Sequence, residues 1–130
     1  MAINIVYTNT QTSKPPAGGF AAALTVYDAT AIVATDYTVF NVGFNPRYVR
    51  FENITDRVGI EWFKGMAANS CLKTVAAGTR TLEVTGGNGG ITICDPDGTA
   101  NANGQCFKVL QDATLAAIKA SKSCNWVAFA

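Results

Sequence analysis

Residues 46–66, PRYVRFENITDRVGIEWFKGM, are the most informative stretch of this 130-residue chain. The first half of this stretch alternates between apolar and charged side chains. Val49 and Phe51 fall on one face of an extended segment. Arg50 and Glu52 fall on the other face. This two-residue period predicts a β-strand with one buried and one solvated face.

A tight turn follows this strand. Residues 53–57 include Asn and Asp, whose side chains hydrogen-bond their own backbone in turns, so they predict a hairpin between strands 48–53 and 58–64. Within the second strand Trp62 and Phe63 are consecutive and therefore point to opposite faces. One is expected in the core. The other is expected to be covered by a second sheet, by a loop or by another subunit.

Short β-branched and aromatic runs continue on both sides of this hairpin. They recur roughly every 8 to 14 residues and are separated by Gly, Asn and Asp, a spacing typical of antiparallel sandwiches and barrels. We therefore expect an all-β fold: a single-domain antiparallel β-sandwich of jelly-roll type with about eight strands, spanning residues 21–130. The runs are 3–7, 22–27, 31–34, 37–44, 48–53, 58–64, 79–84, 91–94, 107–110 and 125–129.

One stretch favours a helix instead. In residues 112–121, DATLAAIKAS, Asp112 is placed to cap a helix, and Leu115 and Ile118 would share one face.

The first 20 residues are expected to form an extended N-terminal arm. Pro15 and Pro16 favour an extended backbone, and Gly18 and Gly19 follow them before the first strand of the predicted domain. The segment is interpreted either as a connecting loop between strands or as an arm that docks on a neighbouring subunit.

The composition favours protein contacts. Charged residues make up 15% of the chain, against about 25% in an average soluble domain, and 48% of the residues are hydrophobic. The net charge of +1 lacks the basic excess that binding to nucleic acid requires. No apolar run approaches the roughly 18 to 20 residues of a membrane span, and residues 1–19 do not resemble a secretion signal. We therefore expect no nucleic-acid partner, no membrane partner and synthesis in the cytoplasm.

Neither catalysis nor a cofactor is expected. The chain contains no histidine, the commonest general base, and its four cysteines are too widely spaced for a zinc knuckle. Glu52 and Glu61 are candidates for a carboxylate pair, but neighbouring Arg and Lys favour ionised, salt-bridged carboxylates. Residues 95–103 carry Asp and Asn like a calcium loop, yet a proline and an early glycine break the required spacing. The prediction is a non-enzyme without metal or cofactor.

Two of the cysteines bracket one predicted loop. Cys94 ends one strand and Cys106 precedes the next, so their sulfurs would meet if these strands pair. Free thiols, favoured in cytoplasm, and a disulfide both remain open from the sequence.

Residues 43–57, GFNPRYVRFENITDR, and residues 61–67, EWFKGMA, resemble small virion proteins of tailed bacteriophages, which are usually encoded near the major capsid protein. Residues 72–82 and 89–92 are similar as well, so the resemblance covers about half of the chain. It implies a head decoration, or capsid cement, protein. Such a protein is an all-β module on the capsid exterior that binds the major capsid protein, clamps adjacent capsomers and is expected to form a homo-oligomer.

The charged hairpin is the expected partner-binding site, and its turn is expected to place Arg50 and Glu52 near Glu61 and Lys64. An alternative is a receptor- or carbohydrate-binding module of a phage tail or head fibre, in which aromatic rings serve as sugar platforms. Tyr48 and Trp62 are the candidate rings for that role. The full set of expected partner-binding residues is Arg47, Tyr48, Arg50, Glu52, Arg57, Glu61, Trp62 and Lys64.

Overall fold

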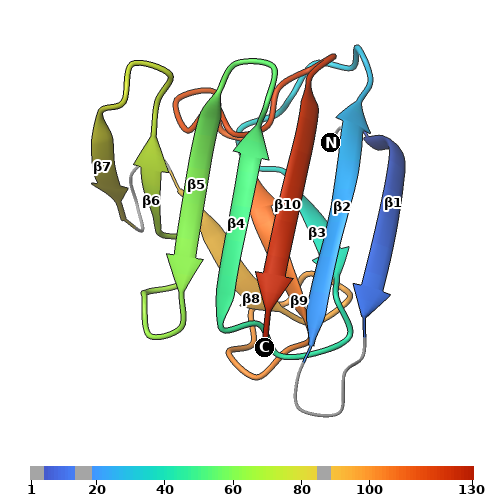
Figure 1. Ribbon diagram of the computed structural model, residues 1–130. Coiled ribbons are helices and arrows are strands. Elements are labelled where there is room, and N and C mark those ends of the chain that lie inside the picture. Colours follow the sequence, from blue (N-terminus) through green and yellow to red (C-terminus); the bar gives the residue numbers. More distant parts are fainter. Residues whose placement is uncertain (1–4, 14–18, 85–88) are drawn as a thin grey trace.

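A computed structural model describes residues 5–13, 19–84 and 89–130, and these residues form two packed antiparallel β-sheets without a helix (Figure 1). The large sheet has seven strands in the order β1-β2-β10-β4-β5-β6-β7, and the small sheet has three in the order β3-β9-β8. The strands are β1 (Ile5–Ser13), β2 (Phe20–Tyr27), β3 (Tyr37–Asn41), β4 (Tyr48–Asn53), β5 (Val58–Phe63), β6 (Cys71–Thr74), β7 (Arg80–Glu83), β8 (Ile91–Cys94), β9 (Cys106–Leu110) and β10 (Ser123–Phe129).

The core lies between the two sheets and is built on aromatic rings. Phe40 of the small sheet packs against Phe51 and Trp126 of the large sheet, with ring centroids 5.6 and 5.4 Å apart. Phe107 stacks on Phe40 at 5.0 Å and meets the edge of Trp126 at 5.2 Å. All four are at least 97% buried, because each comes from the inward-facing set of an alternating strand. The prediction of an all-β sandwich is confirmed.

The hairpin of β4 and β5 forms as the sequence predicts. The Oδ1 atom of Asn53 accepts a hydrogen bond from the Asp56 backbone amide at 3.0 Å, and its Nδ2 donates to the Asp56 carboxylate at 3.0 Å. Arg57 completes the turn with a φ of 59°. The turn sets the register, so that Arg50 lies directly opposite Glu61.

The strand inventory differs from the prediction in two places. Residues 31–34 lead into a turn, closed by a hydrogen bond from the Asp36 amide to the Val33 carbonyl at 2.9 Å. The unpredicted strand β6 pairs with β5 and β7 on its two sides. The described residues hold ten strands, whereas about eight are expected from the sequence. The jelly-roll subtype stays a prediction.

The helix expected over residues 112–121 is absent, and this prediction is wrong. The Asp112 carboxylate accepts hydrogen bonds from the Thr114 and Leu115 amides, as a capping residue does, but only a single turn follows. Ala116 has a φ of 61°, a left-handed conformation that ends a right-handed helix. Leu115 and Ile118 are both fully buried, so core packing sets the path of this segment.

The predicted arm contains an edge strand. Ile5–Ser13 is extended, as expected, but it pairs antiparallel with Phe20–Tyr27 of the same chain and so belongs to the large sheet. The sandwich therefore begins before residue 21. Residues 1–4 and 14–18, which include both prolines, lie outside the described residues. A contact between this segment and a neighbouring protein stays a prediction.

The order of the large sheet brings distant parts of the chain together. The C-terminal strand β10 lies between β2 and β4 (Figure 1). In its register Phe129 is opposite Phe20 on one side and opposite Tyr48 on the other. The small sheet covers the other face of the large sheet, so these three residues lie on the outward face.

Candidate interaction surface

A row of four aromatic side chains crosses the outward face of the large sheet, from β2 to β5. Phe20, Phe129, Tyr48 and Phe63 are consecutive cross-strand partners. Their ring centroids are 5.2, 6.1 and 5.0 Å apart in that order. Phe129 is 42% exposed and Phe63 is 43% exposed. We call these four residues the aromatic row.

A network of charged groups lies beside the aromatic row. Glu61 is its centre: its Oε2 accepts a hydrogen bond from the Tyr48 hydroxyl at 2.6 Å, and its Oε1 accepts one from Arg80 at 2.8 Å. Arg50 lies 3.8 Å from Glu61 and donates to Glu52 at 3.0 Å. Each carboxylate thus has a guanidinium partner within the chain. The expectation of salt-bridged carboxylates is met by these contacts.

These contacts shift two pKa values. Partial burial, followed by the hydrogen bond to the Glu61 carboxylate, raises the pKa of Tyr48. The hydrogen bond to Glu52 raises the pKa of Arg50, against a smaller opposing effect of desolvation. Tyr48 therefore remains a neutral hydrogen-bond donor, and Arg50 remains a cation, throughout the neutral pH range.

The predicted site residues separate into three groups. Tyr48, Arg50, Glu52 and Glu61 form the network. Arg57 lines a hollow of about 60 Å³ together with Arg50, Glu52 and Glu61.

Arg47 and Lys64 are each one residue along the chain from a member of the aromatic row, Tyr48 and Phe63 respectively. The Lys64 amide donates to the Arg47 carbonyl at 2.7 Å, which extends the β4–β5 pairing by one step. The Lys64 ammonium donates to the side-chain oxygen of Asn45 at 2.7 Å. The expected proximity of Lys64 to Arg50 and Glu52 is therefore not found, because Lys64 is at the opposite end of its strand.

Trp62 does not belong to the surface. It is 6% exposed, faces the core from β5 and donates weakly from Nε1 to the Ala67 carbonyl at 3.5 Å. The prediction that Trp62 and Phe63 face opposite ways is confirmed, with Trp62 inward and Phe63 outward. The prediction of Trp62 as a partner-binding residue is therefore wrong, because Trp62 is a core residue.

Sequence reasoning missed three members of the aromatic row: Phe20, Phe63 and Phe129. Each belongs to the outward set of an alternating strand, which is a signal visible in the sequence. The sequence does not predict that these side chains lie close together, because β2, β5 and β10 are far apart along the chain. The same holds for Leu82, which is 62% exposed and lies on β7 opposite Leu72.

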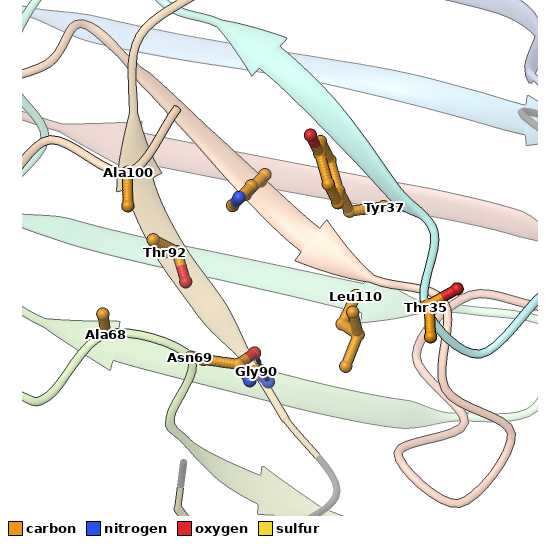
Figure 2. A pocket seen from close by; sticks show the side chains of 9 residues that line it. Thr35, Tyr37, Ala68, Asn69, Gly90, Thr92, Ala100 and Leu110 are labelled. Carbon is orange, nitrogen blue, oxygen red and sulfur yellow. Dashed lines mark hydrogen bonds between the residues drawn. The ribbon is translucent and has the colours of Figure 1, made fainter. Parts of the chain in front are cut away.

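A second feature is a hollow of about 460 Å³ on the outer side of the small sheet (Figure 2). Figure 2 shows Tyr37 and Leu110 on one side of it and Ala68 and Asn69 on the other. Asn69 adopts a φ of 58° and accepts a hydrogen bond from the Gly90 amide at 3.0 Å. The side-chain oxygen of Asn69 thus stabilises the backbone that lines the hollow.

Lys108 of this hollow is also engaged within the chain. Its ammonium lies 4.1 Å from the centroid of the Tyr37 ring and donates to the Gly98 carbonyl at 2.7 Å. Gly98 itself lies so close to Tyr37 that a Cβ there would be 2.6 Å from the Tyr37 hydroxyl oxygen. The three residues thus fasten the loop of residues 95–105 to the small sheet.

The part of the chain that the structure describes holds no candidate metal site and no candidate membrane-spanning helix. No group of three or more His, Cys, Asp or Glu side chains could hold a metal ion there. No helix among those residues is long and apolar enough to cross a membrane.

Comparison with known proteins gave no match: no protein-family model, no curated protein and no solved structure is detectably similar to this chain.

Proposed function

We propose that this chain is a structural virion protein that decorates a bacteriophage capsid and stabilises it by binding the major capsid protein. The observation that carries the proposal is the aromatic row on the outward face of the large sheet. The resemblance of residues 43–57 and 61–67 to phage virion proteins supplies the capsid as the partner.

The outward face suits a lasting protein interface. Aromatic residues and arginine are the side chains most enriched at interface centres, and here Phe63 and Phe129 lie beside Arg50. Burying an unpaired charge would cost several kcal/mol, but Arg50 and Arg80 already have carboxylate partners in the chain. A partner can therefore cover the aromatic row without leaving an uncompensated charge.

Binding to an assembled shell would stabilise that shell. A protein that binds the assembled state better than the free subunits shifts the equilibrium towards assembly, and the effect repeats at every site. A homo-oligomer of this chain would add links between neighbouring capsomers. Particles that lack the protein should then assemble but release DNA at a lower temperature than complete particles. Identical release curves would contradict the proposal.

Co-sedimentation with empty capsids tests the role of the aromatic row directly. Phe63→Ala removes one exposed ring of the row, and Ile54→Ala removes an equally exposed apolar side chain at the β4–β5 turn; both residues are 43% exposed. We expect Phe63→Ala to weaken capsid binding by about tenfold or more, which is typical of an aromatic interface residue. Ile54→Ala should bind like the unmodified protein. Equal binding by both variants would exclude the aromatic row from the interface.

A carbohydrate- or receptor-binding module is the second candidate. It is favoured by the exposed ring of Phe63 beside the Glu61 carboxylate and the Arg50 guanidinium, since sugars stack on rings and hydrogen-bond to charged groups. Trp62 has no part in this candidate because it is buried. A glycan array probed with the purified protein distinguishes the two: specific glycan binding that Phe63→Ala abolishes, without capsid binding, would favour the module.

A further inference from the structure

We propose that Cys94 and Cys106 form a disulfide site, in which an oxidant of the low-molecular-weight disulfide class links the two ends of the loop of residues 95–105. This site is separate from the aromatic row and does not depend on the proposed function.

The first support is the register of the small sheet. Cys94 is the last residue of β8, Cys106 is the first of β9, and the two lie directly opposite each other in the antiparallel pair. Directly opposite residues have Cβ atoms about 4.5 to 5.5 Å apart and Cα atoms within the range that disulfides span. Their side chains are on the same face of the sheet, so a bond needs only local adjustment.

The second support is that the other two cysteines have no such neighbour. Cys71 lies opposite Glu83, and its sulfur is 3.8 Å from the Gly89 carbonyl oxygen. Cys124 lies between Asn53 and Thr25 of the adjacent strands. All four cysteines are free thiols and fully buried, so they differ in their partner and not in their exposure.

The loop protects the pair in the reduced state. The Asn101 amide donates to the Ile93 carbonyl at 3.0 Å, and Gly104 is pressed against the Cys94 carbonyl with no room for a side chain. Burial, and then the proximity of Cys106, raises the pKa of Cys94 to about 11. Burial also raises the pKa of Cys106. Reaction therefore requires the loop to open and a thiol to ionise.

The chemistry is thiol–disulfide exchange with glutathione disulfide. One cysteine thiol loses its proton, and the thiolate attacks a sulfur of glutathione disulfide, which forms a mixed disulfide and releases a glutathione thiolate that takes up a proton. The second cysteine then loses its proton, attacks the protein sulfur of the mixed disulfide and expels the second glutathione. Two protein thiols are oxidised and one glutathione disulfide is reduced to two thiols.

The disulfide would restrain a loop that lines a hollow as large as a small-molecule binding site. Residues 100–103 line a hollow of about 450 Å³ that also involves Lys64 and Met66. Asn45 already ties this loop to the sheet by donating to the Ala102 and Gly104 carbonyls at 2.9 and 2.8 Å. A covalent link at the base of the loop would restrict its remaining opening.

Incubation of the folded full-length protein with glutathione disulfide, followed by thiol counting and peptide mapping, tests the proposal. We expect the four free thiols to fall to two, with Cys94 joined to Cys106. Because thiolate is the attacking species, the rate should rise nearly tenfold between pH 7 and pH 8 and less steeply above that. The product should resist proteolysis within residues 95–105 more than the reduced protein does.

Two variants complete the test. The double variant Cys71→Ser with Cys124→Ser should still form the link. Cys106→Ser should instead trap a mixed disulfide with glutathione at Cys94. Circular dichroism before and after oxidation checks that each protein remains folded. Four unreacted thiols in the folded unmodified protein, or a disulfide that involves Cys71 or Cys124 as often as Cys94, would overturn the proposal.

Discussion

The outer faces of the two sheets differ in what their polar and aromatic side chains contact. On the small sheet, the Lys108 ammonium and the Ile93 carbonyl hold the loop of residues 95–105 in place, so polar groups serve internal structure. On the large sheet, Phe63 and Phe129 remain more than 40% exposed, and the charged groups pair with one another at the surface. Removing a polar group should therefore reduce stability more on the small sheet than on the large one.

The largest difference in stability is expected between removing a buried aromatic ring and removing an exposed one. Phe107→Ala removes a fully buried ring that contacts Phe40 and Trp126, and should lower the free energy of unfolding by about 3 to 5 kcal/mol. Phe63→Ala removes an exposed ring and should cost less than about 1 kcal/mol. Denaturant unfolding of both variants gives the two values. Similar losses would mean that the aromatic row is part of the stabilising core.

Because its thiols are buried, the protein should lose stability at alkaline pH. Burial raises the pKa of Cys124 from its ordinary value of 9.0 to about 12. Between pH 9 and pH 12 the unfolded chain gives up this proton and the folded chain keeps it, so the free energy of unfolding falls by about 1.4 kcal/mol per pH unit for this thiol. Below pH 9 the contribution is complete and independent of pH.

Cys124→Ala measures this contribution. The variant should show a shallower decline of the free energy of unfolding between pH 9 and pH 12, by the slope of one thiol, whatever its stability at pH 7. Parallel pH profiles for the variant and the unmodified protein would show that Cys124 does not titrate as its burial indicates.

A matched pair of cation variants compares the two outer faces. Lys108→Met removes the hydrogen bond to the Gly98 carbonyl and the contact with the Tyr37 ring, and should cost about 2 kcal/mol. Arg50→Met removes surface ion pairs of a side chain that is 47% exposed, and should cost less than about 1 kcal/mol. Thermal and denaturant unfolding of both variants test the difference. A larger loss from Arg50→Met would reverse the comparison.

The smallest change is expected in the pKa of Tyr48 within the charged network. Glu61→Gln removes the negative charge that accepts the Tyr48 hydrogen bond, so the pKa of Tyr48 should fall towards its ordinary value of 10.0. Titration of tyrosinate absorbance, with the curve of Tyr48→Phe subtracted, measures the shift. Glu52→Gln is the control, because Glu52 pairs with Arg50. An equal shift in both variants would mean that the hydrogen bond to Glu61 is not its cause.

Local patterns were sufficient for the β4–β5 hairpin. The predicted strand 48–53 has the observed bounds, and the Asn53–Asp56 contacts form the predicted turn. Both depend on residues within a few positions of each other. The same local reasoning failed over residues 112–121, because Ala116 takes a left-handed conformation that allows Leu115 and Ile118 to reach the core. A helix pattern of that length is weak enough for tertiary packing to override it.

The candidate surface was predictable only in part. Arg50, Glu52 and Glu61 come from one hairpin, so alternation and the turn place them together. The partners Arg80 and Phe129 come from β7 and β10, and no local pattern tells which strands become neighbours in a sheet. For the same reason the sequence left Trp62 and Phe63 undecided, although it required them to face opposite ways.

The amino-acid sequence was enough to predict the all-β class, the β4–β5 hairpin and the two faces of the hairpin strands. These follow from the two-residue period of side chains and from short-range turn hydrogen bonds. Three features could be seen only in the folded chain: β10 lies between β2 and β4, Trp62 is inside while Phe63 is outside, and Cys94 is in register with Cys106. Strand order and register depend on contacts between residues far apart in the chain, where burial of a shared core, rather than local preference, selects the arrangement.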